Sequence, residues 1–96
     1  MMDKYDIIKK LRAIKPVLQK TFSVKTLGLF GSFADGTNTP ESDVDIMVEL
    51  ERPIGWNFFR LEKQLEQTLN RKIDLVTQNA LKEQIKPYIL KQMLYI

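Results

Sequence analysis

The chain has 96 residues, a formal net charge of +3, 44% hydrophobic and 28% charged residues, and neither cysteine nor histidine. The length fits one domain, residues 1–96, and the missing residue types exclude disulfides, thiolate zinc sites and imidazole chemistry, leaving carboxylates as the only strong metal ligands. No apolar run approaches the roughly 20 residues of a membrane span, and the N-terminal segment lacks a signal peptide's apolar region. We therefore expect a soluble cytoplasmic protein without a membrane partner.

The first quarter of the chain is predicted to be a helix. Asp3 can cap it, and it runs to about Lys20 with apolar residues at helical spacing. Pro16 should kink or split it, because proline removes an amide donor and clashes with the preceding turn. The same segment is rich in lysine, which we interpret as a solvated helix face rather than as an RNA-binding surface.

Two strands and a long turn are expected next. Residues 25–30 are predicted to form a buried strand, residues 36–42 are all of types that favour turns, and residues 43–50 are predicted to form a second strand. Residues 52–55 are expected to form another turn before the next helix.

The second half alternates in the same way. A helix is expected over residues 57–69 and a third strand over 72–76. Asn79 can cap a helix that runs to about Lys86, and Pro87 suits the first turn of a last helix. The fold class is thus α/β (α+β), a small mixed sheet of about three strands flanked by helices that cover one face. The core face of the last helix is expected to consist of Leu90, Met93 and Leu94.

Three acidic residues are the candidate catalytic and metal-binding groups. Asp43 and Asp45 are two residues apart in the second strand, so their side chains share one face. Two buried carboxylates are costly unless a cation neutralises them, and oxygen ligands suit Mg²⁺ or Mn²⁺. Asp74 joins them if the second and third strands are neighbours, and three carboxylates can hold two metal ions. Alternatively, Asp43 is a turn residue and the other two face solvent.

A glycine-serine turn follows the first strand. Gly31 would let the backbone approach a phosphate, and Ser32 offers a hydroxyl and an amide at a helix N-terminus. Ser42, just before the acids, is a further candidate for nucleotide binding. The structural alternatives are that Ser32 is a helix N-cap and that Ser42 only caps its loop.

Taken together, these motifs are Gly31-Ser32, Gly36, Ser42-Asp43-x-Asp45 and Asp74. This set resembles the nucleotidyltransferase superfamily of DNA polymerase beta type, over almost the whole chain from Lys25 to the last helix. The small size resembles its minimal members, the MNT proteins, which are commonly antitoxins paired with a HEPN-domain ribonuclease toxin.

The resemblance implies metal at Asp43, Asp45 and Asp74, and triphosphate at Gly31 and Ser32. Active MNT antitoxins transfer AMP from ATP to a tyrosine hydroxyl of the toxin. In that scheme Asp43 and Asp45 bind both metals, while Asp74 orients and helps to deprotonate the attacking hydroxyl.

Other functions stay open. Many relatives carry a basic residue before the glycine that matches Gly36, whereas this chain has Asp35, a charge unhelpful to a triphosphate unless it points away. One alternative is therefore a non-catalytic antitoxin that neutralises its toxin by stable binding. Transfer to RNA or to a small molecule such as an aminoglycoside is disfavoured, since the chain resembles no domain dedicated to either, and a homodimer is left open. Candidate phosphate-binding cations are Lys25, Arg52 and Arg60. Candidate base-binding aromatics are Phe33 and Trp56, for which packing in the core is the equal alternative.

Overall fold

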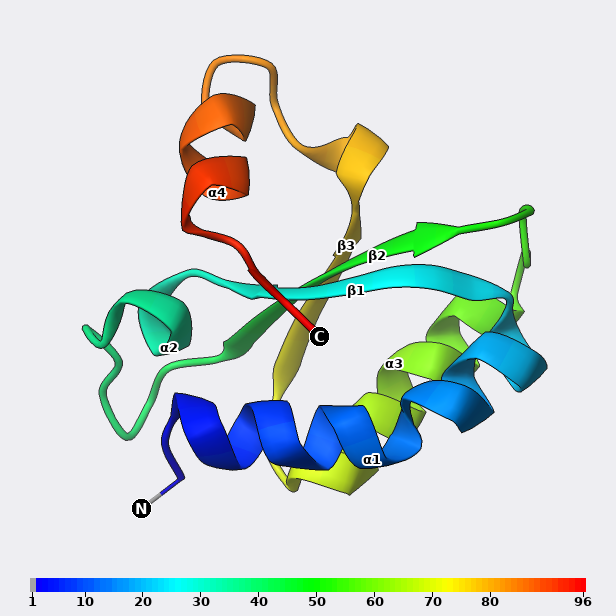
Figure 1. Cartoon of the computed structure of the whole chain (residues 1–96), viewed down its shortest axis with the longest axis horizontal. Coiled ribbons are helices and arrows are strands. Elements are labelled where there is room, and N and C mark those ends of the chain that lie inside the picture. Colours follow the sequence, from blue (N-terminus) through cyan, green and yellow to red (C-terminus); the bar gives the residue numbers. More distant parts are fainter. Residues whose placement is uncertain (1) are drawn as a thin grey trace.

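A computed structural model describes residues 2–96 as one four-stranded sheet with helices on both sides (Figure 1). The strand order is β3-β2-β1-β4, so the expected mixed sheet is confirmed with one strand more than predicted. Among the described helices, none combines the length and apolar character needed to cross a membrane. The elements are α1 (Lys4–Phe22), β1 (Val24–Phe30), α2 (Ser32–Asp35), β2 (Val44–Leu50), α3 (Asn57–Leu69), β3 (Ile73–Thr77), the 3-10 turn η1 (Gln78–Ala80), α4 (Lys86–Gln92) and β4 (Leu94–Tyr95).

The first helix begins at a reciprocal capping box. The Asp3 carboxylate accepts from the backbone amide of Asp6, and the Asp6 carboxylate accepts from that of Asp3. The helix then runs through Pro16 without ending, so of the two predicted effects of this proline, a kink or a split, the split does not occur. Its C-terminal cap is Ser23 in the left-handed conformation.

The sheet combines an antiparallel and a parallel pair. β1 and β2 are antiparallel, with Phe30 opposite Asp45. β2 and β3 are parallel, with Asp45 opposite Asp74, and α3 makes the crossover between them. The amino end of β2 therefore lies between the carboxyl end of β1 and the amino end of β3.

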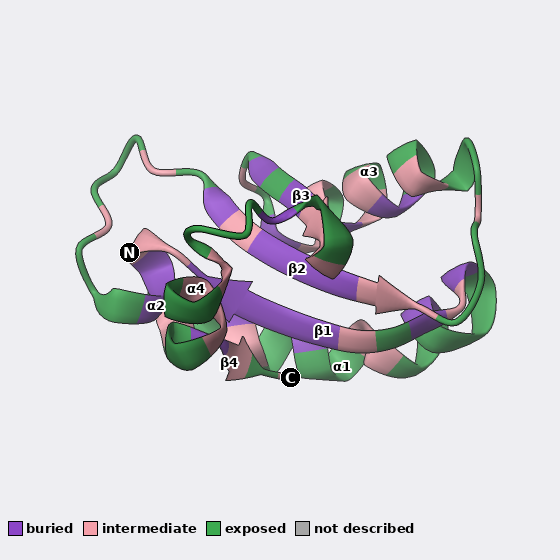
Figure 2. Ribbon diagram, turned by 90° about the horizontal axis from the view of Figure 1, so that it is seen from above, coloured by how far each residue is buried: buried purple, intermediate pink, exposed green. Residues whose placement is uncertain are grey.

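The main core lies between the sheet and the pair α1 and α3 (Figure 2). Alternate residues of β2, namely Val44, Ile46 and Val48, point into it and are fully buried. The helices contribute leucines at helical spacing, because only one stripe of each faces the sheet. These leucines are Leu11, Leu18, Leu61, Leu65 and Leu69.

A smaller cluster covers part of the opposite face, where the C-terminal segment crosses the sheet (Figures 1 and 2). It contains Phe30, Met47, Leu81 and Met93. Met47 alternates with Ile46 along β2, so this is also the face that carries Asp45. The face with the acidic residues is thus partly covered by the chain end and partly open.

The C-terminal third differs most from expectation. The predicted helix from Asn79 to Lys86 is wrong, because Asn79 lies inside the short turn η1, Leu81 is extended, and a further turn from Lys82 leads into α4. The last helix does begin around Pro87, but it ends at Gln92. Leu94, predicted on its core face, instead lies in β4 and pairs with Leu29 of β1.

Candidate functional site

Two of the three acidic residues are direct neighbours across the sheet. Asp45 in β2 and Asp74 in β3 are partners in the parallel register, so their side chains leave the same face side by side. Asp43 lies one residue before β2 and projects from the same side by strand alternation. The fold therefore gathers the three predicted residues at one end of one sheet face.

Gly31 lies against the Asp45 carboxylate. Its backbone has φ +75° and ψ −153°, a conformation that is essentially restricted to glycine. A β-carbon built on Gly31 would overlap the carboxylate oxygen of Asp45 and would lie 2.9 Å from its Cγ. The glycine is needed for two independent reasons: its own backbone angle and the space that Asp45 occupies.

Asp45 is the residue of the site whose pKa is shifted most. Desolvation by burial, followed by the negative charges of Asp74 and Asp43, raises the pKa of Asp45 from 3.8 to about 6. Asp43 and Asp74 are themselves exposed. In the described part of the chain, no positive charge offsets this carboxylate. A bound cation would offset both the desolvation cost of its charge and its repulsion from Asp43 and Asp74.

The chemistry of these groups fits a divalent metal. Within residues 2–96, the side chains form no ready group of three ligands around one point. Mg²⁺, however, usually keeps several waters and binds proteins through one or two carboxylates together with substrate phosphates. The pair of Asp45 with Asp74, and that of Asp45 with Asp43, each provide such a partial set.

The two predicted nucleotide-binding serines, Ser32 and Ser42, occupy different structural positions. Gly31 is the N-cap of α2 and Ser32 its first residue, so the alternative in which Ser32 is the cap is wrong. No side chain caps the amino end of α2. The Ser42 hydroxyl accepts from the Thr39 amide at 2.8 Å, which gives it the loop-capping role considered as an alternative.

Asp35 points into its own loop. Its carboxylate accepts from the Thr37 amide at 2.9 Å and from the Thr37 hydroxyl at 2.6 Å. These hydrogen bonds lower the pKa of Asp35 and keep it ionised. The departure from the basic residue of many relatives is thus accounted for by a structural role at the end of α2.

Arg71 is a residue of this region to which the sequence analysis assigned no role. Its Nη2 donates to the carbonyl oxygens of Pro40 and Ser42, and its guanidinium lies 4.9 Å from the ring centroid of Phe33. A single arginine after a helix carries no sequence signal for these contacts, because all three partners lie about 30 or more residues earlier in the chain.

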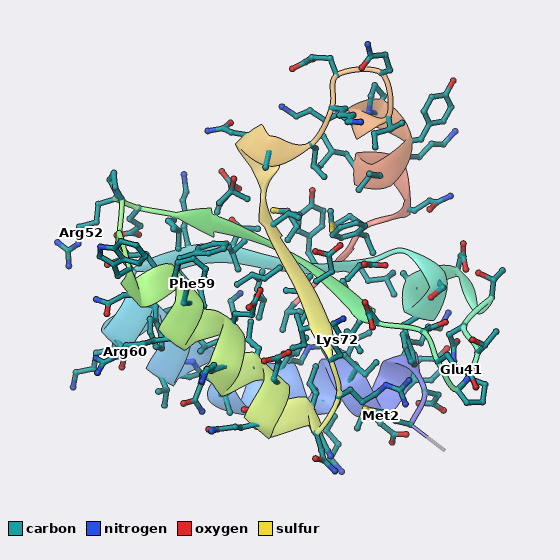
Figure 3. The ribbon with its side chains drawn as sticks, turned by 180° about the vertical axis from the view of Figure 1, so that it is seen from behind. Met2, Glu41, Arg52, Phe59, Arg60 and Lys72 are labelled. Atoms are coloured by element: carbon teal, nitrogen blue, oxygen red, sulfur yellow. The ribbon has the colours of Figure 1, made fainter. Side chains whose placement is uncertain are left out.

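The other candidate cations and aromatics lie elsewhere. Lys25, Arg52 and Arg60 belong to the end of the sheet away from the acids, so their proposed contact with phosphate is not supported. Figure 3 shows Arg52, Phe59 and Arg60 together, opposite the loop that carries Glu41. Phe33 is buried in the main core, whereas Trp56 is 85% exposed and stacks on Phe59.

A hollow of about 440 Å³ lies at that far end, beyond the carboxyl ends of β2 and β3. Its lining includes Glu49 and Glu51 as well as Arg52 and Asn79. Two carboxylates make this lining unfavourable for a triphosphate. The acidic face near Gly31 is therefore the better candidate for nucleotide chemistry.

Comparison with known proteins shows a family match over most of the chain. The family described as polymerase beta, nucleotidyltransferase matches residues 12–96. A candidate protein adenylyltransferase of Methanocaldococcus jannaschii is 46% identical over 74% of this chain and 84% of the relative. The protein adenylyltransferase MntA of Thermococcus cleftensis is 38% identical over 90% of this chain and 88% of the relative.

Solved structures share the fold. A candidate minimal nucleotidyltransferase has a TM-score of 0.79 and 24% identity, covering 97% of this chain and 95% of its own. A toxin-antitoxin complex crystallised with AMP-PNP has a TM-score of 0.67 and 25% identity, covering 98% and 72%. A structure of the tri-AMPylated Shewanella oneidensis HEPN toxin in complex with MNT antitoxin matches with a TM-score of 0.62 and 19% identity, covering 92% of this chain and 68% of its own.

Proposed function

This chain belongs to the polymerase beta nucleotidyltransferase family, and from that premise we propose that it transfers AMP from ATP to a tyrosine hydroxyl of a HEPN-domain toxin. Residues 1–96 would form a single minimal nucleotidyltransferase domain acting as the antitoxin. The names of the relatives as protein adenylyltransferases support the reaction class. The HEPN class of the partner follows from the resemblance of the motifs to MNT antitoxins.

The observation that carries the proposal is the contact between Gly31 and Asp45, beside Asp74. A glycine-only turn brings the start of α2 directly onto a carboxylate whose neighbours are two further carboxylates. Three neighbouring carboxylates at the end of a sheet repel one another and lower stability, so a purely structural role does not explain them. A bound cation and a phosphate chain would turn the same arrangement into a favourable one.

The reaction can be written with named groups. The tyrosine oxygen attacks the α-phosphorus of ATP, a new phosphorus–oxygen bond forms, and the bond from the α-phosphorus to the bridging oxygen breaks to release pyrophosphate. Asp74 would orient the attacking hydroxyl and accept its proton. Gly31 and Ser32 would hold the triphosphate through backbone amides and the serine hydroxyl, with Ser42 shaping the neighbouring loop.

Asp43 and Asp45 would hold two divalent ions, Mg²⁺ or Mn²⁺, with Asp74 as the third carboxylate of the set. When bound, the ions would neutralise the charge on the phosphate oxygens. Asp45 would bind them in its ionised form, which a cation favours over the protonated form.

A second function is favoured by one observation. Asp35 stands where many relatives carry a basic residue, so that position offers a triphosphate no positive charge, as expected of an antitoxin that neutralises its toxin only by stable association. The two functions differ in whether the acids are required.

Co-expression with the toxin separates them. Wild-type protein and the Asp43→Asn variant would each be expressed with the HEPN-domain product of the neighbouring gene, and growth and the toxin's mass would be measured. The enzyme predicts growth rescue and added AMP with wild type, and loss of both with the variant despite intact binding. Rescue by Asp43→Asn without added AMP would instead establish the passive antitoxin.

A further inference from the structure

Arg71 connects three segments that are far apart in the sequence. It lies at the start of β3, two residues before Ile73 and three before Asp74. Its Nη2 donates to Pro40 O at 3.0 Å and to Ser42 O at 2.9 Å, two of the three carbonyls that directly precede Asp43. Its guanidinium also lies over the ring of Phe33, which follows Gly31 and Ser32 in α2.

The loop before Asp43 is otherwise held by its own short-range bonds. Ser42 and Thr39 bond each other, and Asp35 bonds Thr37. These contacts fix the shape of the loop but do not fix it to the sheet. Arg71 supplies a connection from this loop to the strand that carries Asp74.

The way in which Arg71 is bound is specific to arginine. One planar group faces an aromatic ring while a single nitrogen serves two carbonyls, a combination that a flexible ammonium reproduces only in part. Among residues 2–96 its buried Nε has no hydrogen-bond partner, and both of its hydrogen bonds are made by Nη2. Its contacts reach the three segments that bear the candidate site residues.

We propose that Arg71 is a positioning residue: it fixes the loop of Pro40 and Ser42, and α2 through Phe33, against the start of β3, and thereby sets the position of Asp43 relative to Asp45 and Asp74. This inference rests on the proposed function. It assigns to Arg71 no contact with substrate, and its effect reaches the metal only through Asp43.

Binding of Mn²⁺, followed by electron paramagnetic resonance with and without AMP-PNP, tests the proposal without relying on activity. Arg71→Met keeps a long unbranched side chain but removes both hydrogen bonds and the guanidinium that lies over Phe33. It is expected to weaken Mn²⁺ binding about 10- to 100-fold, the usual effect of losing a group that orients a metal ligand. Arg71→Lys should recover part of the affinity, and Arg60→Ala, an exposed arginine of α3, is the matched control with wild-type affinity.

A double-variant cycle shows whether Arg71 acts through Asp43. In the Asp43→Asn background, Arg71→Met should cause little further loss of Mn²⁺ affinity, because the ligand that it positions is already gone. Additive losses would contradict positioning through Asp43. Thermal unfolding of each variant, measured in parallel, identifies any variant that has lost its fold.

The outcomes are separable. A folded Arg71→Met that binds Mn²⁺ like wild type overturns the proposal and leaves a purely structural role. Should Arg71→Met not fold, Arg71→Lys carries the test: weaker binding than wild type supports positioning, and wild-type affinity overturns it. Failure of the wild-type protein itself to bind Mn²⁺ would instead contradict the metal-dependent function proposed above.

Discussion

At the scale of single residues, the site depends most on Asp45. Its carboxylate touches Gly31, is partly buried, and is the group on which the charges of Asp43 and Asp74 act. Asp43 and Asp74 are exposed, and the Ser42 hydroxyl bonds within its own loop. Changes at Asp45 and at the atoms that touch it should therefore have the largest effects on chemistry.

Gly31→Ala should remove transfer activity and lower stability. The substituted side chain would be held in a backbone conformation that costs about 1–3 kcal/mol for residues other than glycine, and its β-carbon would displace the Asp45 carboxylate. Gly55→Ala is the matched control, because Gly55 has φ +57° but open space around it. It should cost about 1–2 kcal/mol and leave AMP transfer unchanged. Equal activity of the two variants in a transfer assay would contradict the role of the contact.

The raised pKa of Asp45 predicts a pH dependence of folding in the absence of metal. Because the folded state holds this proton up to about pH 6 and the unfolded state only to about 3.8, protonation stabilises the fold at low pH. The free energy of unfolding of wild type, relative to Asp45→Asn, should therefore fall as pH rises from about 4 through 6 and then level off. Urea unfolding of both proteins across this range measures it. Parallel curves would contradict the raised pKa.

At the scale of elements, the C-terminal segment is held to the sheet by Met93 over Gly28. A β-carbon on Gly28 would lie 2.5 Å from Met93 Sδ and 2.8 Å from its Cγ. Gly28→Ala should cost about 1–3 kcal/mol through overpacking, and Met93→Ala about 2–5 kcal/mol through the cavity that it leaves. The double variant should cost less than the sum, because each change relieves the other. Urea unfolding tests this, and simple additivity would show that the two residues do not share the space.

The elements that were predictable are those with a strong local pattern. The apolar stripe of α3 and the apolar strands β1, β2 and β3 were located to within a residue or two. β4 could not be predicted, since two residues carry no periodicity and Leu94 is fixed by pairing with Leu29. The helix predicted from Asn79 failed because the segment after β3 must cross the sheet, and Leu81 is buried there in an extended conformation.

At the scale of the whole molecule, strand order determines which distant residues meet. The sequence predicted that Asp74 would join Asp45 only if their strands were neighbours, and the parallel register places the two residues opposite each other. It offered no means to find Arg71, nor to know that Asp35 would turn into its own loop. Such contacts arise from the tertiary arrangement, and no residue spacing in the sequence indicates them.

Phe59, on which Trp56 stacks, lies at the opposite end of the molecule from the loop of Glu41 that leads to Asp43 (Figure 3). Substitutions at the acids should therefore change transfer without disturbing the surface around Trp56 and Phe59. This separation predicts that Asp45→Asn keeps the far-UV circular dichroism and the thermal unfolding cooperativity of wild type while losing transfer. Loss of folded structure in that variant would show that the acid has a structural role instead.

The most direct test of the central claim is label transfer between purified components. The protein would be mixed with Mg²⁺, ATP labelled on its α-phosphate and the HEPN-domain product of the neighbouring gene, with Asp45→Asn as the matched control. The account predicts label on a tyrosine of the partner with wild type and none with the variant. Label that persists in Asp45→Asn would contradict the assigned site, and an unlabelled partner that is nevertheless bound and inhibited by wild type would contradict the transferase function.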